Sequence, residues 1–339
     1  MYIVYVPQPR YTQIDIEATP YYHVISRCVR RAFLCGYDRA SAQCFDHRKG
    51  WVLERLAELS GSFAISINAY AVLSNHLHLV VRIDSTRARQ WAAAEVVERY
   101  GALFPRAVQC WEGFSQAAQA QRVALWRARL SDLSWFMRCL NEAIARRANQ
   151  EDGCTGHFWE GRFRSQALLD EAGLLTCMTY VDLNPIRAGL ATSLGESDFT
   201  SIQQRLEASA GRSGAVGEGQ DKKAKGPRRP ELSALARSGA GEAEPDLPIG
   251  LEQYVELLVA TASALRQELP GRALPDASSK VLAQVGIRST HWVETVTNYH
   301  RHFFSMVGEV QRIAIHCART DRDKAKGSNW AKQVFRPAA

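Results

Sequence analysis

Two histidines separated by a single leucine, His76 and His78, lie in an apolar run that extends from Ile65 to Ile83. The run is rich in β-branched and aliphatic residues without helical spacing, so it predicts a buried β-strand. Because side chains alternate along a strand, both imidazoles are expected on the same face. Two neutral imidazoles side by side on a sheet can begin a divalent metal site. The alternative is a pair of core histidines that bond to nearby backbone groups.

A tyrosine followed by an asparagine-proline pair lies farther along, beginning at Tyr180. The segment Glu171–Leu183 predicts a helix with Asp170 as its N-cap. The helix should end near Asn184, because proline disfavours helical geometry in the residue before it, and Gly189 offers a C-terminal stop. Tyr180 and Asn184 are four residues apart, so they are expected on one face of the helix.

These residues suggest phosphodiester chemistry. A tyrosine hydroxyl is protonated at neutral pH, so its attack on a phosphodiester is helped by a divalent cation that stabilises the developing charge. The amide oxygen of Asn184 would complete a site begun by His76 and His78. Arg187, just beyond the proline, would hold a phosphate. The alternative is that Tyr180 lines the edge of the core and that Asn184 only ends the helix.

The elements that would carry these side chains alternate between strand and helix. Residues 21–33 predict a first strand and residues 45–59 predict a helix, and the histidine run follows them. The order strand, helix, strand is typical of half of a ferredoxin-like unit with an antiparallel sheet. The expected fold class is therefore α+β, with more helices across the alanine-rich residues 85–150.

Composition limits the classes of protein that fit. The 339 residues are enough for two domains, and a hydrophobic content of 46% is enough for a packed core. No stretch is long and apolar enough to span a membrane. The eight cysteines are scattered without a C-x-x-C pair, and the first ten residues lack the pattern of a secretory signal. We therefore expect reduced cysteines and a cytoplasmic protein. A net charge of +7 favours a polyanionic partner, with nucleic acid the first candidate.

Three parts of the chain differ in composition. Residues 1–207 carry the candidate chemistry and predict one catalytic domain. Residues 208–250 are dominated by Gly, Ser, Ala, Pro and charged residues, which predicts a disordered linker. Residues 251–339 return to amphipathic helical spacing and predict a separate helical domain. Its basic and aromatic side chains would suit DNA contact, and a solvated helical face explains them equally well.

Four segments occur together in one order, and they carry a resemblance to a known family. They are Tyr22–Arg27, Ala71–His78, Gly156–Ser165 and Tyr180–Leu190. Together they resemble the single-tyrosine HUH transposases, and most closely the REP-associated tyrosine transposases. The resemblance covers roughly residues 15 to 205, and four motifs in register are far more specific than any one of them.

The resemblance implies both a fold and a reaction. The fold is a ferredoxin-like antiparallel sheet with packed helices, of the HUH nuclease type. The reaction cuts single-stranded or hairpin DNA: a tyrosine attacks a phosphodiester, forms a covalent 5′-phosphotyrosine and releases a 3′-hydroxyl, and a later attack reseals the strand. By position, Tyr180 is the nucleophile, and His76, His78 and Asn184 are ligands of magnesium or manganese. Some relatives form dimers and others act as monomers, so the resemblance allows a homodimer without deciding the oligomeric state.

Several further side chains are candidates for DNA contact. Arg162 and Arg164 are two residues apart, so they would share one face of a strand and suit a DNA backbone. Trp159 would stack on an unpaired base, or pack beneath the catalytic helix. Arg27 and Arg187 would also face the DNA.

Two other functions compete with a DNA strand transferase. One is a non-catalytic DNA-binding regulator that retains the transposase fold; such a protein would not need His76, His78 and Tyr180 together. The other is a ferredoxin-like RNA-binding module, which is disfavoured because the strands carry no recognisable aromatic RNP signature.

Overall fold

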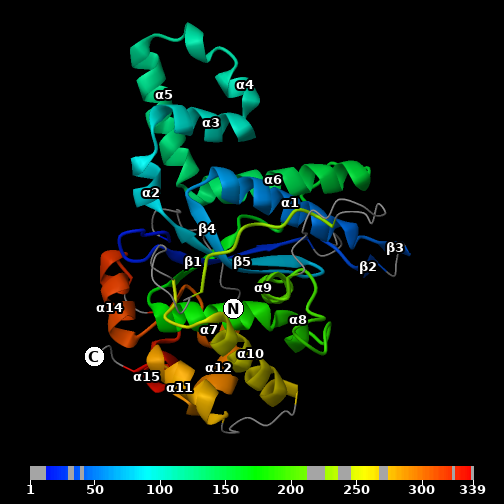
Figure 1. Ribbon diagram of the computed structural model, residues 1–339, viewed down its shortest axis with the longest axis vertical. Helices are drawn as coiled ribbons and strands as arrows, with labels where there is room; N and C mark the ends of the chain where they lie inside the picture. Colours follow the sequence, from blue (N-terminus) through cyan, green and yellow to red (C-terminus); the bar gives the residue numbers. More distant parts are fainter. Residues whose placement is uncertain are drawn as a thin grey trace, which may run out of the picture. The chain divides into compact units, whose positions relative to one another are not determined.

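The computed structural model describes residues 13–29, 34–38, 42–211, 226–235, 246–266, 274–322 and 325–336. The fold is α+β, as predicted, with many helices (Figure 1) and a five-stranded, mostly antiparallel sheet of strand order β4-β5-β1-β6-β7. Contacts divide the chain into two compact units, and β1 (Tyr21–Arg27) contributes to both. The histidine unit comprises Ile25–Phe163 and Phe199–Leu232; the tyrosine unit comprises Met1–Val24, Arg164–Asp198 and Ser233–Ala339.

The paired histidines lie on the second strand of a β-hairpin in the histidine unit. β4 (Ile65–Val72) and β5 (His76–Ile83) are antiparallel, with Ala71 opposite His78. The prediction of a single strand across residues 65–83 is therefore wrong. The chain reverses at residues 73–75, where serine and asparagine favour a turn. The hairpin places the histidines at the beginning of β5, directly after this turn.

Two long helices form a layer against this hairpin. α1 (His47–Ser62) matches the helix predicted from the sequence, and it packs on both β4 and α6 (Leu133–Glu151) (Figure 1). Phe63 and Phe136 meet edge to face with ring centroids 5.3 Å apart, an arrangement that aromatic quadrupoles favour. A small second hairpin is formed by β2 and β3, which are Tyr37–Asp38 and Gln43–Cys44.

The chain between β5 and α6 forms a helical insertion, in agreement with the helices predicted for residues 85–150. Its core is aromatic: Tyr100 stacks on Trp126 with ring centroids 4.7 Å apart, and Trp111 contacts the same indole. The elements of the insertion are α2 (Ser85–Gln90), α3 (Ala93–Leu103), α4 (Pro105–Val108), the 3-10 helix η2 (Trp111–Gly113) and α5 (Gln116–Leu130).

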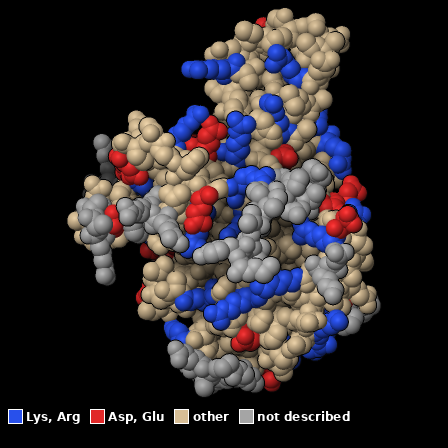
Figure 2. Space-filling view, turned by 180° about the vertical axis from the view of Figure 1, so that it is seen from behind, with Lys and Arg blue, Asp and Glu red and all other residues tan. Residues whose placement is uncertain are grey.

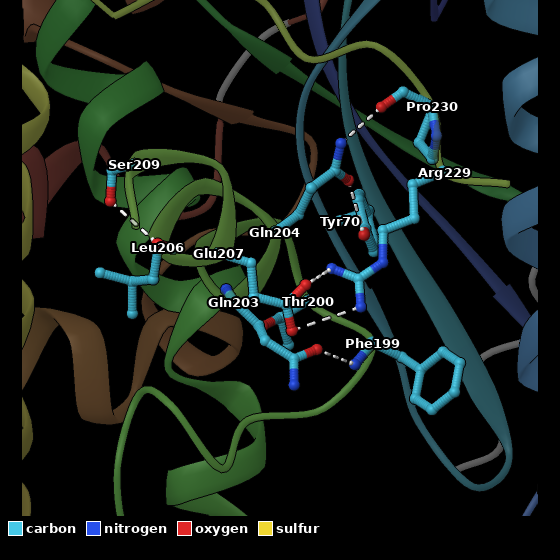
Figure 3. A network of polar contacts seen from close by, with 10 residues as sticks. All are labelled: Tyr70, Phe199, Thr200, Gln203, Gln204, Leu206, Glu207, Ser209, Arg229 and Pro230. Carbon is cyan, nitrogen blue, oxygen red and sulfur yellow. Dashed lines mark hydrogen bonds and ion pairs between the residues drawn. The ribbon is translucent and has the colours of Figure 1, made fainter. Parts of the chain in front are cut away.

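A short stretch of the predicted linker is docked within the histidine unit. The carbonyl oxygen of Pro230 accepts a hydrogen bond from the side chain of Gln204, in α9 (Ser201–Ser209), at 2.7 Å (Figure 3). The same glutamine accepts a hydrogen bond from the hydroxyl of Tyr70 on β4 at 2.8 Å. One amide side chain therefore ties the docked stretch to both a helix and a strand.

Two further contacts fasten this stretch. Arg229 forms an ion pair with Glu207 of α9 (Figure 3), and Leu232 forms a parallel bridge with Ile67 of β4. Residues 226–232 thus cover part of the outer edge of the sheet, where unpaired backbone groups would otherwise be open to another chain. Residues 212–225 and 236–245, which also belong to the predicted linker, lie outside the described residues.

The tyrosine unit is built around the predicted catalytic helix. α7 (Glu171–Asp182) begins at Asp170, whose side chain accepts a hydrogen bond from the backbone N–H of Gly173 at 2.7 Å, as predicted. Eleven of its twelve residues are buried, so the helix must be covered on every side. It connects β6 (Arg164–Leu168) to the short α8 (Asn184–Arg187).

The C-terminal residues supply much of this cover. α12 (Trp292–Thr297) packs on α7 (Figure 1), and β7 (Met306–Val307) runs parallel to β6. These contacts join the C-terminal part of the chain to the segment that carries Tyr180; a separate helical domain and the boundaries at 207 and 250 stay predictions. The other elements are α10 (Leu251–Arg266), α11 (Asp276–Gln284), η3 (Ser289–His291), α13 (Tyr299–His302), α14 (Val310–Arg319) and α15 (Ser328–Val334).

Two findings bear on the composition. All eight cysteines are free thiols, and five of them are buried. No helix in the described part of the chain is both long enough and apolar enough to cross a bilayer.

Replacing Gly173 with alanine is expected to destabilise the fold. A Cβ atom there would lie 2.7 Å from the carbonyl oxygen of Val307, so α7 would have to move away from β7. Overpacking of this kind lowers the free energy of unfolding by about 1–3 kcal/mol, which urea denaturation measures. Gly61→Ala in α1 is the control: nothing lies within 4 Å of its Cβ, so stability should be unchanged or rise by up to about 1 kcal/mol. Equal losses in both variants would contradict the expected clash.

Candidate active site

His76 and His78 lie side by side at the beginning of β5. Their ring centroids are 4.7 Å apart with the planes at 71°. His78 is 2% exposed and His76 is partly buried. The prediction that the two imidazoles emerge on one face of a strand is confirmed, and the hairpin holds them next to each other.

The side chain of Asn75 orients the first imidazole. Its amide oxygen lies 2.6 Å from Nδ1 of His76, and because an amide oxygen only accepts hydrogen bonds, Nδ1 carries the proton. Nε2 then carries no proton, so its lone pair is available to a metal ion. A hydrogen bond at the other ring nitrogen prepares a histidine for metal ligation in this way. Burial lowers the pKa of His76 to about 4, with a smaller contribution from the positive charge of Arg27. The imidazole is therefore neutral at pH 7, as a metal ligand must be.

The phenol ring of Tyr180 is enclosed within the tyrosine unit and is 7% exposed. It stacks on Tyr299 with ring centroids 4.5 Å apart and planes at 23°, while His23 approaches edge-on at 6.1 Å. The guanidinium carbon of Arg187 lies 4.6 Å from the centroid of the ring, a cation–π contact. These three neighbours restrict the directions in which the ring can point.

Asn184 follows Tyr180 by four residues, but regular helix is interrupted between them. α7 ends just before Leu183, which has φ −87° and ψ 0°, and α8 begins at Asn184. The backbone N–H of Leu183 still donates to the carbonyl oxygen of Thr179 at 3.0 Å, so hydrogen bonding continues across the interruption. Gly189, with φ +68°, ends α8 in the left-handed conformation that its sequence position predicts.

The structure assembles the predicted site residues in two groups. His76 and His78 belong to the histidine unit, whereas Tyr180, Asn184 and Arg187 belong to the tyrosine unit. Each group is organised by its own unit, the first by the β4–β5 hairpin and the second by α7 and α8. Their union in one metal-dependent site is a proposal.

Three of the arginines predicted to contact DNA are exposed. Arg27 forms an ion pair with Glu160 at 3.7 Å, and both side chains are open to solvent. Arg162 and Arg164 are also exposed, but only Arg164 lies in β6. The prediction that they share one face of a strand is therefore wrong, because the strand begins two residues later than Arg162.

Two other predicted DNA contacts are engaged within the protein. The indole N–H of Trp159 donates to the carbonyl oxygen of Asn141 at 2.9 Å. The guanidinium of Arg187 donates to the carbonyl oxygen of Thr297 at 2.8 Å. Trp159 therefore packs against α6, while part of its surface stays exposed. For both side chains the structure gives a packing role, and a role in DNA contact stays a prediction.

Sequence reasoning missed a buried polar group beside Tyr180. The hydroxyl of Tyr299 donates to Oε1 of Gln166 at 2.5 Å, and Nδ1 of His23 lies 3.2 Å from the same oxygen. No signal in the sequence marks Tyr299, because it lies far along the chain from Tyr180 and outside the four motifs. The sequence does not mark Gln166 either, because a single glutamine in the five-residue β6 carries no pattern of its own.

In the part of the chain that the structure describes, residues that could bind a metal do not form a dense cluster. Nowhere in the described ranges are three or more His, Cys, Asp or Glu side chains grouped so that they could hold a metal ion. The ligand set expected from the sequence has only two histidines, so it depends on the amide oxygen of Asn184 as its third donor.

Comparison with known proteins gives one likeness. No model of a known protein family and no curated protein matches this chain. Among solved structures, it is similar to a REP-associated tyrosine transposase bound to a REP hairpin, over 60% of this chain and 88% of that one. The sequences are 14% identical and the TM-score is 0.32, which does not establish the family.

Acid is expected to destabilise the folded chain through His76. Its folded-state pKa of about 4 is below the ordinary value of 6.5, so the unfolded chain binds the proton more readily. The stability that depends on this group is fully present above pH 6.5 and is lost as the pH falls towards 4, by up to about 3 kcal/mol. Urea unfolding at several pH values in this window compares the wild type with His76→Gln, which cannot titrate. An identical pH dependence in both proteins would contradict the assignment.

Proposed function

We propose that the chain is a transposase-like DNA strand transferase. It cleaves and rejoins single-stranded or hairpin DNA through a covalent 5′-phosphotyrosine at Tyr180, with magnesium or manganese held by His76, His78 and Asn184. A ferredoxin-like core of the HUH nuclease type is part of the same proposal. A homodimer, which the resemblance allows, stays a prediction.

The paired imidazoles on β5 are the observation that supports this function most strongly. A histidine that serves only as core packing has no need of a neighbouring imidazole 4.7 Å away. In His76 the hydrogen bond from Nδ1 to Asn75 and the lowered pKa both favour an unprotonated Nε2 at neutral pH. Both features prepare a ligand, and a DNA-binding surface without catalysis would benefit from neither.

The donor set fits a divalent cation that accepts both nitrogen and oxygen. Imidazole nitrogen suits Mn²⁺ better than Mg²⁺, which prefers oxygen ligands and gives up water reluctantly. Such a cation polarises the phosphodiester and stabilises the negative charge of the attack. We therefore expect stronger activity with manganese than with magnesium.

Tyr180 supplies the nucleophile. Its phenolic oxygen forms a bond to phosphorus as the bond from phosphorus to the 3′ oxygen breaks. The phenol loses its proton, and the departing 3′ oxygen takes one up to become a hydroxyl. A later 3′-hydroxyl attacks the phosphotyrosine, which restores both the phosphodiester and the phenol. Because the ester conserves the bond energy, no nucleotide cofactor is needed. Arg187, which already contacts the Tyr180 ring, would lie beside the phosphate.

Positive charge that could attract DNA is concentrated in the helical insertion and α6. Residues 85–150 hold ten arginines and five acidic residues, a net charge of +5 compared with +7 for the whole chain. Figure 2 shows Lys and Arg side chains on the visible surface of the helical insertion, at the top of the view. Phosphate contact by such arginines would supply affinity without sequence preference.

Tyr180→Phe is expected to abolish covalent attachment to DNA while hairpin binding is retained. Phenylalanine keeps the ring that packs on Tyr299 and removes only the nucleophilic oxygen. The protein is incubated with manganese or magnesium and with labelled single-stranded hairpin oligonucleotides from the DNA that flanks its own gene. Denaturing gels then report the adduct, and fluorescence anisotropy reports binding.

Two histidine variants make this test specific. His76→Ala should form no adduct because a proposed metal ligand is gone. His157→Ala, which changes an exposed histidine outside the β4–β5 hairpin, should still form the adduct. Hairpin binding by the wild type with no adduct under either metal would reject the strand transferase and favour the DNA-binding regulator.

Removing two exposed arginines, Arg106 and Arg146, is expected to weaken hairpin binding and its salt dependence. Arg146 is 79% exposed, and the removal of one arginine–phosphate interaction should reduce the slope of log affinity against log salt by about one. Arg127→Ala is the control, because its guanidinium donates to the carbonyl oxygen of Trp91 at 2.6 Å and so supports the fold. Anisotropy titrations over a range of salt concentrations measure the slopes. An unchanged slope in the double variant would show that these helices do not contact the DNA backbone.

A further inference from the structure

The C-terminal part of the chain lies outside the resemblance, yet it contacts α7 at both ends. At the beginning of the helix, the backbone N–H of Glu309 donates to Oδ2 of Asp170 at 2.6 Å. At its end, the hydroxyl of Tyr254 donates to Oδ2 of Asp182 at 2.7 Å, and both of these side chains are fully buried. The helix that carries the proposed nucleophile is thus fixed by residues from beyond position 250.

Between these two ends, Tyr299 contacts the nucleophile itself. Tyr299 is 2% exposed, and its hydroxyl donates to Oε1 of Gln166 on β6. Burial raises the pKa of Tyr299 well above its ordinary value, so the hydroxyl stays protonated and continues to donate. A hydroxyl that is buried, protonated and bonded to an amide is poorly suited to attack DNA. Tyr299 contacts Tyr180 through the face of its ring, which the hydrogen bond to Gln166 holds in place.

We propose, building on the proposed function, that Tyr299 is a positioning residue that sets the orientation of Tyr180 for attack. The rings stack at 4.5 Å, and the anchor at Gln166 fixes the ring of Tyr299 from its far end. A tyrosine side chain has two rotatable bonds, and stacking on a fixed ring restricts both. Orientation of this kind matters because a displacement of about 1 Å can lower a reaction rate by about 100-fold.

The other neighbours of Tyr180 limit the size of the expected effect. His23 and Arg187 contact the same ring, so removing Tyr299 takes away one of three restraints. We expect Tyr299→Ala to slow single-turnover adduct formation by about 10- to 100-fold. Tyr299→Phe keeps the stacked ring and removes only the anchor, so it should recover most of the rate. The affinity for the hairpin should change by less than about twofold in both variants, because neither alters a proposed DNA contact.

Two controls separate positioning from loss of stability. Val334→Ala opens a cavity at a buried position of α15, a helix that packs against α14 and η3, and it should leave the adduct rate unchanged. The second control measures the ring itself. Protein labelled with 3-fluorotyrosine gives a fluorine NMR signal for Tyr180, which is assigned by its loss in Tyr180→Phe. In Tyr299→Ala this signal should shift and change in width as the ring becomes free to reorient.

The two readouts keep this inference distinct from the proposed function. A slower adduct rate with unchanged hairpin affinity and a changed fluorine signal supports the positioning role. A wild-type rate in Tyr299→Ala, or a loss of rate equal to that in Val334→Ala, overturns it. If the wild type forms no adduct at all, the proposed function fails. In that case a changed signal still supports restraint of the Tyr180 ring by Tyr299, and an unchanged signal overturns it.

Discussion

Burial of eleven of the twelve residues of α7 takes the polar side chains of that helix out of water, so their hydrogen-bond partners have to come from inside the protein. The carboxylate of Asp182 shows the demand most clearly, because it is fully buried and accepts a hydrogen bond from Tyr254. The hydroxyl of Thr176 meets the same demand locally by donating to the carbonyl oxygen of Ala172 at 2.6 Å. An exposed amphipathic helix would bury only one face and need no such partners. The residues that cover α7 come largely from beyond position 250, so α7 can be buried only when it packs together with the C-terminal part of the chain.

Burial also sets the chemistry of the histidine hairpin. Taking an imidazole out of water penalises its charged form, and this penalty is the main reason that the pKa of His76 is lowered to about 4. The nearby guanidinium of Arg27 acts in the same direction. Asn75, at the turn between β4 and β5, fixes which nitrogen carries the proton. The turn that carries Asn75, the buried strand β5 and the charge of Arg27 together keep the imidazole of His76 neutral and fix its orientation.

The sequence predicted what depends on neighbouring residues and missed what depends on distant ones. Asp170 as N-cap and Gly189 as helix stop follow from local backbone rules, and both are confirmed. Alternation along a strand placed His76 beside His78 correctly, although the reversal of the chain at residues 73–75 was missed because both arms of the hairpin are apolar. Tyr299 could not be found in this way, since its contact with Tyr180 exists only after segments far apart in the chain have packed.

The two tyrosines that the C-terminal part directs at α7 act on different levels. The bond from Tyr254 gives the buried carboxyl group of Asp182 a hydrogen-bond donor, so its loss would act on the stability of the helix as a whole. The stack of Tyr299 on Tyr180 involves two side chains, and its loss would act first on the orientation of one ring. Stability and orientation are therefore separable in this part of the chain, although both depend on the same packing. A region without motifs can in this way influence a site whose recognisable residues all lie elsewhere in the sequence.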